Sequence, residues 1–339
     1  MRAIAYRQPG PIDAPDALVA IDMPRPEPTR RDILVEVKAV SVNPVDTKLR
    51  AGSAPFAGRA ERILGWDAAG IVAAVGPEVT RFMPGDAVAY AGSIARDGSN
   101  AEYHLVDERI VGRKPAKLSF AEAAALPLTS ITAWETLFDR LRVGEPVPGA
   151  APAVLVIGGA GGVGSVAIQL ARALTDLTVI ATASRPETRE WVRSLGAHHV
   201  VDHGRPIAAE VAALGLGAPA FVFSTTQTDR HLSDIAALIA PQGRFALIDD
   251  PMHLDILPFK RKSVSVHWEL MFTRPLFQTA DMDEQGRLLE RVADLVDAGR
   301  MRSTLTATLS PISPGTLAEA HRRVESGAMR GKIVVEGWG

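Results

Sequence analysis

Short alternations of apolar and polar residues dominate the first third of the chain. The segment 32–43, DILVEVKAVSVN, has the pattern of a half-buried strand, with Glu36 and Lys38 on its polar face. Further short strands are predicted at 68–75, 86–90 and 102–106, and turns that contain glycine and proline separate them. Many short strands at close spacing favour a compact, barrel-like β domain.

From residue 119 the apolar positions follow a helical period. The segment FAEAAALPLTSITAWETLF predicts two helices that are divided at Pro127. Beyond it, apolar runs typical of buried strands alternate with helical stretches such as 187–195 and 231–240. The predicted strands lie at 154–157, 178–182, 199–202, 220–223, 244–248 and 264–266. Six strands with helical crossovers predict an α/β fold with a doubly wound parallel sheet.

The C-terminal tail has its own pattern. Amphipathic helices are predicted at 283–298 and 317–326, and a last strand is predicted at 332–335. Such a tail is too short to bury a core by itself. We therefore expect it to return to the N-terminal β domain.

A glycine-rich segment, VLVIGGAGGVGS at 154–165, connects the first of the six strands to a helix. From Gly159 its glycines have the spacing G-x-G-x-x-G, and a helical repeat begins among the last of them. Backbone N–H groups and the helix dipole would form an anion site that a pyrophosphate can approach closely. A flexible loop is the alternative, but the strand before and the helix after favour nucleotide binding. The expected contacts are Gly159, Gly161, Gly162, Val163 and Gly164.

The residues after the second of these strands bear on the choice between NAD and NADP. A carboxylate there would bind a ribose 2′-hydroxyl and repel a 2′-phosphate. This chain has Ala183, Ser184 and Arg185, so a hydroxyl and a guanidinium are available to a phosphate. Glu187 argues against NADP, because its carboxylate would repel a 2′-phosphate, although an acidic residue also suits the first turn of a helix. The residues predict NADP(H), with a solvated surface role for Arg185 as the alternative.

Composition narrows the class of protein. A chain of 339 residues suits two domains, and its net charge of −2 offers no general attraction to nucleic acid. It contains no cysteine, which excludes disulfides, thiolate metal sites and a cysteine nucleophile. The N-terminus lacks the apolar core of a signal peptide, and no apolar run is long enough to cross a bilayer. We expect a soluble, cytoplasmic protein.

The order of β domain, nucleotide domain and returning tail resembles the medium-chain dehydrogenase/reductase superfamily over essentially the whole chain. The specific phrases are NPVD at 43–46, GWDAAG at 65–70, PGD at 84–86, PLTSITAW at 127–134 and GKIV at 331–334. They are similar to the quinone-oxidoreductase branch, and most similar to its zinc-type alcohol dehydrogenase-like subfamily. The resemblance implies a GroES-like β-barrel catalytic domain at 1–125, a Rossmann NADP-binding domain at 126–266 and a return to the catalytic domain at 267–339. It also implies a homodimer, formed by edge pairing near Val264–His267.

The zinc of that subfamily's name conflicts with the residues. Zinc alcohol dehydrogenases of this superfamily use two cysteines and a histidine at the catalytic metal and four cysteines at a structural one. The histidine of the family's G-H-E segment is Trp66 here, and a tetrahedral zinc needs three or four converging donors. His198, His199, Asp202 and His203 cluster at a strand end in the nucleotide domain, and we interpret them as mostly surface residues. No metal is expected.

The catalytic candidates follow from the resemblance. It places the amide of Asn43 near the nicotinamide and Lys48 where relatives often carry a tyrosine. Lys48 could bind the nicotinamide ribose, polarise a carbonyl or donate a proton, or it could be a solvated loop cation. Asp67 could orient Lys48 or cap a turn. Trp66 is expected to shape the substrate pocket.

Further cofactor contacts are predicted in both domains. By resemblance, Thr129 binds the nicotinamide side of the cofactor and Lys332 approaches it, although a surface lysine is nearly as good an interpretation. The other candidates are His203 near the adenine ribose phosphate, Ser224 and Ile248 after the fourth and fifth strands, and Phe272 at the nicotinamide pocket.

These features together predict a reductase of quinones or α,β-unsaturated carbonyl compounds (enones). Such acceptors are already electrophilic, so hydride transfer to them needs no metal. Two alternatives stay open: a zinc-type alcohol dehydrogenase, and an NADPH-binding protein with little turnover. Metal analysis and assays of alcohol oxidation would distinguish a zinc-type alcohol dehydrogenase from the predicted reductase. A filled cofactor site without turnover would favour the NADPH-binding protein.

Overall fold

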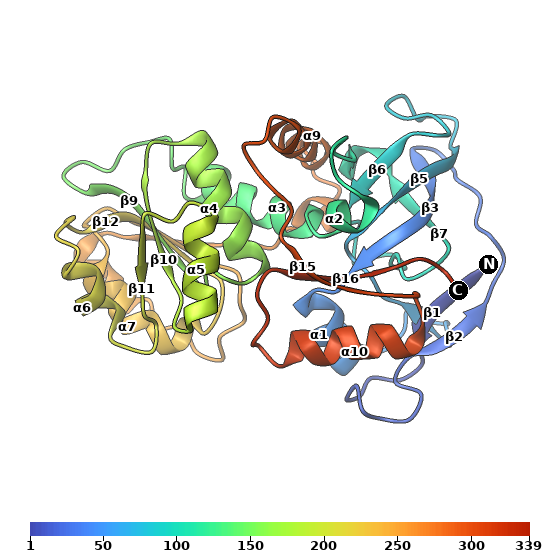
Figure 1. Cartoon of the computed structure of the whole chain (residues 1–339), viewed down its shortest axis with the longest axis horizontal. Helices are drawn as coiled ribbons and strands as arrows, with labels where there is room; N and C mark the ends of the chain where they lie inside the picture. Colours follow the sequence, from blue (N-terminus) through green and yellow to red (C-terminus); the bar gives the residue numbers. More distant parts are fainter. The chain divides into compact units, whose positions relative to one another are not determined.

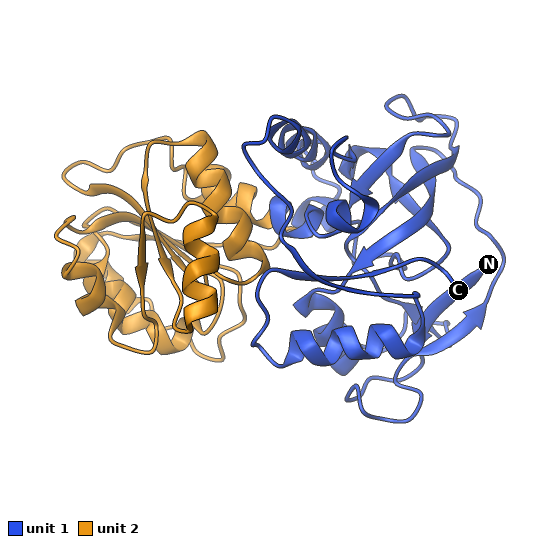
Figure 2. Ribbon diagram, viewed as in Figure 1, with its two compact units in different colours: residues 1–131, 272–339 blue, residues 132–271 orange.

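A computed structural model describes residues 1–339, which form two compact units. The first unit consists of residues 1–131 and 272–339, and the second of residues 132–271 (Figure 2). The boundary in the middle of the chain falls inside helix α3 (Pro127–Trp134), which begins at the proline that divides the two predicted helices. No helix is long and apolar enough to cross a membrane.

Two β-sheets form the frame of the first unit. Strand β3 (Asp32–Ser41) is the longest and pairs with three neighbours in a seven-stranded sheet of order β15-β16-β3-β5-β6-β8, in which β7 also pairs with β3. The other strands of this sheet are β5 (Ala68–Val75), β6 (Ala87–Tyr90), β7 (Tyr103–Asp107), β8 (Val111–Arg113), β15 (Leu305–Leu309) and β16 (Lys332–Glu336). A small sheet has the order β2-β1-β4, formed by β1 (Arg2–Tyr6), β2 (Val19–Asp22) and β4 (Arg62–Ile63). The short strands predicted from the alternating pattern are confirmed.

The C-terminal tail completes the large sheet of the first unit, as predicted. Strand β16 pairs antiparallel with β3, with Val334 opposite Ser41 and Val335 opposite Val40. Figure 1 shows this last strand, in red, beside the blue β3. The tail also contributes α8 (Thr273–Phe277), α9 (Glu284–Asp297) and α10 (Pro314–Glu325). This return brings residue 332 next to residues of the first half of the chain.

Helix α1 (Pro44–Gly52) was not predicted, because the sequence pattern suggested a loop. Asn43 is its N-cap and forms a capping box with Asp46, and Pro44 occupies the first helical position. Both are favourable helix starts. The helix has few apolar residues and lacks the periodic stripe on which the prediction depended. The remaining helical segments of this unit are α2 (Phe120–Ala124) and the 3-10 turn η1 (Glu108–Ile110).

The second unit is a parallel sheet of six strands in the order β11-β10-β9-β12-β13-β14. Its strands are β9 (Ala151–Ile157), β10 (Thr178–Thr182), β11 (His199–Val201), β12 (Pro219–Ser224), β13 (Arg244–Leu247) and β14 (Ser265–Trp268). The order reverses between β9 and β12, which is the switch point of a doubly wound fold. The predicted fold class is confirmed, and only strand ends differ, most clearly at the start of β9 and at β14.

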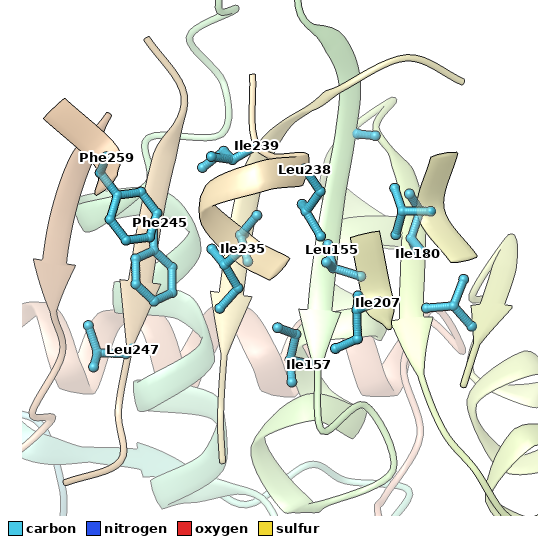
Figure 3. Packing of buried hydrophobic residues seen from close by; sticks show 14 residues of the cluster. Leu155, Ile157, Ile180, Ile207, Ile235, Leu238, Ile239, Phe245, Leu247 and Phe259 are labelled. Carbon is cyan, nitrogen blue, oxygen red and sulfur yellow. The ribbon is translucent and has the colours of Figure 1, made fainter. Parts of the chain in front are cut away.

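Helices connect these strands and cover the sheet. They are α4 (Gly162–Leu174), α5 (Pro186–Ser194), α6 (Ile207–Ala212) and α7 (Thr228–Leu238), with a π-helical turn η2 (Glu135–Arg140) and a 3-10 segment η3 (Leu257–Lys262). Between the sheet and its helices lies a core that includes Leu155, Ile180 and Ile235, with the stacked rings of Phe245 and Phe259 at a centroid distance of 5.5 Å (Figure 3). This packing holds the carboxyl ends of the strands in fixed positions, and the predicted nucleotide site lies there.

Candidate functional site

The glycine turn after β9 has the geometry of a phosphate cradle. Gly161 is the N-cap of α4, and no side chain caps this helix start, so the first N–H groups of the helix have no intrahelical partner. A Cβ on Gly164 would lie 2.4 Å from the carbonyl oxygen of Gly158, whereas a Cβ on Gly161 would meet nothing closer than 3.5 Å. The absence of a side chain at Gly164 therefore allows α4 to pack closely on the turn. The absence of a side chain at Gly161 leaves the first N–H groups of α4 accessible.

The other predicted contacts of the second unit lie at the same carboxyl edge of the sheet. Ser184 and Arg185 follow β10 and are exposed, and Arg185 forms an exposed pair with Glu187 at 3.1 Å. His203 follows β11 and is half-buried. Ile248, another predicted contact, follows β13 and is half-buried. Ser224, the last one, ends β12 and is fully buried. Its hydroxyl shares a hydrogen bond of 2.7 Å with the hydroxyl of Thr228.

In the first unit, three predicted residues form one buried network. The Lys332 ammonium, at the start of β16, lies 3.1 Å from Asp67 Oδ2 and donates to the side-chain oxygen of Asn43 and, at 3.1 Å, to the carbonyl oxygen of Val42. The Asn43 amide in turn donates to Asp67 Oδ2 at 2.9 Å. Asn43, Asp67 and Lys332 are each at most 4% exposed. Lys332 is thus a buried ion-pair partner, and the interpretation of Lys332 as a surface lysine is wrong.

Asp67 also caps α3. Its Oδ1 accepts a hydrogen bond of 2.7 Å from the N–H of Leu128, in the first turn of that helix. Burial raises the pKa of Asp67, and the Lys332 ammonium and the N–H donors oppose this effect. Both oxygens of the carboxylate have partners. Through them Asp67, at the start of β5, is connected to the N-cap of α1, to the first turn of α3 and to β16. Thr129, next in α3, is buried and donates its hydroxyl hydrogen to the carbonyl oxygen of Leu126 at 3.0 Å.

Asp46 is a fourth member of this network, which the sequence analysis did not single out. One of its carboxylate oxygens accepts from the N–H of Asn43 at 2.8 Å, and the other accepts from the N–H of Gly65 at 2.9 Å. Burial raises the pKa of Asp46 to about 7, against the effect of these donors and of Lys332. Asp46 lies in the phrase NPVD, whose capping-box spacing was the available signal.

Lys48 and two aromatic side chains complete the predicted residues of the first unit. Lys48 lies on α1 and is exposed, so it is a helical residue and not a loop cation. Trp66 is fully buried and contacts Phe272 edge to face, with ring centroids 6.3 Å apart. The indole N–H of Trp66 has no hydrogen-bond partner.

The donor set around Trp66 does not suit zinc. The polar groups around Trp66 are an amide and two carboxylates, with no thiolate and no imidazole among them, and the Lys332 ammonium already lies against Asp67. No group of three or more His, Cys, Asp and Glu side chains has the arrangement of a metal site anywhere in the chain. The residues present therefore do not fit the metal.

Comparison with known proteins agrees with this fold. Residues 195–335 match the zinc-binding dehydrogenase family, and residues 29–132 match the alcohol dehydrogenase GroES-like domain. The chain is 40% identical to a zinc-type alcohol dehydrogenase-like protein of Staphylococcus aureus (strain MSSA476) over 99% of both chains.

Two solved structures extend the comparison. A crystal structure from Rhizobium etli CFN 42, provisionally named a zinc-dependent alcohol dehydrogenase, is 68% identical with a TM-score of 0.99, covering 100% of this chain and 98% of that one. The quinone oxidoreductase of Coxiella burnetii is 27% identical with a TM-score of 0.80, covering 100% of this chain and 99% of that one. The chain therefore belongs to the medium-chain dehydrogenase/reductase superfamily and is an oxidoreductase similar to the zinc-type alcohol dehydrogenase-like proteins and the quinone oxidoreductases.

Proposed function

We propose that this oxidoreductase is a zinc-independent, NADPH-dependent reductase of quinones or α,β-unsaturated carbonyl compounds. The observation that carries the proposal is the buried network at the segment Gly65-Trp66-Asp67. There the Lys332 ammonium lies 3.1 Å from Asp67, and Trp66 takes the place of the histidine ligand. A divalent cation at this place would meet the repulsion of the ammonium and would lack thiolate and imidazole donors.

The absence of suitable zinc ligands restricts the substrates that the proposal allows. A simple ketone or alcohol needs a Lewis acid or a strong acid–base pair, whereas a conjugated carbonyl is itself electrophilic and gathers negative charge on its oxygen. NADPH, when bound, supplies the hydride. The protein then has to bind the acceptor, orient it and donate hydrogen bonds to the developing oxyanion.

For this task the chain offers Lys48 in the first unit. Lys48 is an exposed cation on α1, and we assign it the hydrogen bond or proton that the acceptor oxygen receives. Asn43 and Asp67 are positioning residues in this proposal. Their polar atoms are engaged with Lys332, Leu128 and each other, and they hold the start of α1 through the capping box at Asn43.

The cofactor would be held by the glycine turn and the carboxyl edge of the second unit. The N–H groups at the start of α4 suit the pyrophosphate. No carboxylate ends β10, and in this proposal Ser184, Arg185 and His203, which follow β10 and β11, would bind the 2′-phosphate. Thr129, Ser224, Ile248 and Phe272 remain proposed contacts of the nicotinamide half.

The test is to mix the purified protein with NADPH or NADH and a panel of quinones, enones, ketones and alcohols, and to follow the absorbance of the reduced nicotinamide. Parallel samples contain EDTA or added zinc. We expect oxidation of NADPH by quinones or enones that EDTA does not slow and that is weaker with NADH. Activity that requires zinc would support an alcohol dehydrogenase instead. Tight NADPH binding without oxidation by any acceptor would support a binding protein.

A lysine variant tests the assigned donor. Lys48→Ala is expected to lower kcat by roughly 10²-fold, the usual effect of removing an acid–base group, with unchanged affinity for NADPH. Lys117→Ala, which removes another exposed lysine of the same unit, is the matched control. Equal activities of the two variants would remove Lys48 from the proposal and leave the cofactor and acceptor assignments to the first experiment.

A further inference from the structure

Two histidines from different elements meet at the carboxyl edge of the second unit. His203 follows β11, and His231 lies in the first turns of α7 beside Arg230. Their ring centroids are 6.4 Å apart with an interplanar angle of 53°. The sequence analysis singled out His203 alone, because α7 follows another strand and its residues carry no motif.

His203 is tied to the glycine turn through one hydroxyl. The N–H of Gly158 donates to Thr182 Oγ1 at 3.0 Å, and the same oxygen lies 3.1 Å from His203 Nδ1. The tautomer of His203 decides which of these two atoms donates. No group of the chain hydrogen-bonds to Nε2. The imidazole of His203 is therefore linked through Thr182 to the glycine turn, where we propose that the pyrophosphate binds.

His231 has an unusual environment for a side chain that is only 5% exposed. Neither of its ring nitrogens hydrogen-bonds within the chain, and neither is among the fully enclosed polar atoms that lack a partner. The imidazole can therefore bond to a group from outside the chain, either water or a ligand.

Charged groups of both signs surround the two rings. Burial lowers the pKa of His203, and Arg230 and Arg185 lower it further, while Asp202 opposes them. Burial, Arg230 and His203 likewise lower the pKa of His231, against the effect of Asp234 and Asp229. Both rings are thus neutral at neutral pH, each with one N–H donor and one acceptor nitrogen, and Arg185 and Arg230 supply the positive charge with which an anion at this edge would pair.

The carboxylates of this edge are already engaged. Asp202 accepts from the N–H of Gly204 at 2.8 Å, and Asp234 accepts from the N–H of Ile207 at 2.9 Å. Asp229 accepts from the N–H of Arg230 at 2.9 Å. Glu187 forms an exposed pair with Arg185, which a doubly charged phosphate can displace because such pairs are weak.

We propose that Arg230 and His231, together with Arg185 and His203, bind a phosphate monoester, the 2′-phosphate of NADPH, and determine the preference for NADPH over NADH. This inference rests on the proposed function, which supplies the phosphorylated cofactor. The adenosine ribose joins the pyrophosphate to the 2′-phosphate, so the two anion sites have to be close. The contact of Gly158 and His203 through Thr182 meets that requirement.

The experiment measures the dissociation constants of NADPH and NADH by isothermal titration calorimetry. Wild-type protein is compared with Arg230→Ala, Arg230→Lys and His231→Phe, and the circular dichroism of each variant checks its folding. Arg193→Ala is the matched control, because Arg193 is exposed in the last turn of α5, at the opposite edge of the sheet, and its loss changes the net charge equally. A further titration uses adenosine 2′,5′-bisphosphate against adenosine 5′-monophosphate.

We expect Arg230→Ala to raise the dissociation constant of NADPH about tenfold and that of NADH less than twofold, since it removes one charge-assisted contact to the phosphate. Arg230→Lys should keep most of the affinity, His231→Phe should lower it several-fold for NADPH alone, and Arg193→Ala should change neither constant. The bisphosphate should bind more tightly than the monophosphate in the wild type and not in Arg230→Ala.

Two unfavourable outcomes are distinguishable. If both coenzymes bind and the variants leave their ratio unchanged, this inference is overturned while the proposed use of a nicotinamide cofactor stands. If neither coenzyme binds to the wild type, the proposed function itself fails, and the inference fails with it.

Discussion

At the scale of single residues, the ion pair of Lys332 and Asp67 has the largest structural consequence. The two side chains are 4% and 0% exposed, and they connect the last strand of the chain to the start of β5 and of α3. A buried charge whose partner is removed is strongly destabilising, because the desolvation penalty is no longer compensated.

Lys332→Met is therefore expected to lower the free energy of unfolding by about 3–5 kcal/mol, because it leaves Asp67 buried without its cation. The measurement is urea denaturation followed by circular dichroism. The double variant Lys332→Met/Asp67→Asn should recover part of the loss, since the carboxylate is then replaced by a neutral amide. A single variant as stable as the wild type would show that Lys332 does not hold the network together.

His104 on β7 provides a pH-dependent contribution to stability. The ring is buried between the Tyr90 hydroxyl at 3.1 Å and the carbonyl oxygen of Asp97 at 2.9 Å, and burial lowers its pKa to about 4. The unfolded chain takes up this proton near pH 6.5, so the folded state loses stability as the pH falls from 6.5 towards 4.

Comparison of the wild type with His104→Gln isolates this contribution from other titrating groups. The difference in their free energies of unfolding should be constant above pH 7 and shrink by up to about 1.4 kcal/mol per pH unit between 6.5 and 4. Denaturation curves at several pH values give this difference. Curves that stay parallel over the whole range would contradict the prediction.

At the scale of elements, the turn between β9 and α4 divides a packing role and the proposed binding role between different glycines. Gly159 lies against β10 and α5, where a Cβ would approach Ala181 Cβ to 2.9 Å and Val192 to 3.3 Å. Gly164 packs against the turn itself, whereas a Cβ on Gly161 would only reach ordinary contact distance, 3.5 Å, from the carbonyl oxygen of Gly158. The same local sequence therefore determines both the fold of the unit and its proposed cofactor site.

Two alanine substitutions separate these roles. Gly164→Ala is expected to cost about 1–3 kcal/mol of stability, because its Cβ would lie 2.4 Å from the carbonyl oxygen of Gly158. Gly161→Ala should leave stability within about 0.5 kcal/mol, as expected without a steric conflict, and should weaken NADPH binding instead. Thermal denaturation and calorimetric titration measure the two effects. Equal losses of stability in both variants would disprove the separation.

At the scale of the whole molecule, β14 is one of the two edge strands of the six-stranded sheet. An edge strand presents unpaired backbone groups to a partner, and Trp268 at its end is 54% exposed. The homodimer expected from the family resemblance would use this edge, and it stays a prediction.

Light scattering coupled to size-exclusion chromatography tests that prediction. We expect a dimer for the wild type and a monomer for Trp268→Lys, because a cation at an apolar edge opposes the approach of an identical strand. Phe277→Lys, which changes another exposed aromatic residue outside this sheet, is the control. A monomeric wild type would contradict the expected assembly, and a dimeric Trp268→Lys would place the interface elsewhere.

Prediction from sequence succeeded where the signal was local. The six parallel strands were recognisable because their apolar runs are buried on both faces, and the glycine turn because its spacing lies within one strand–turn–helix unit. Helix α1 was not predicted, because its start is stabilised by the capping box of Asn43 and Asp46 and the helix has no apolar stripe. Asp67 was assigned to orient Lys48 or cap a turn, and the structure shows it capping α3 and pairing with Lys332.

The sequence by itself therefore determined the class of fold, the glycine turn between a strand and a helix and the lack of thiolate ligands for zinc, because these depend on residue type and short spacing. Only the tertiary structure decided that Lys332 is buried against Asp67 and Asn43, and that His231 faces His203. Sheet pairing and helix packing bring these residues together from distant parts of the chain, and no local pattern records which side chains will meet.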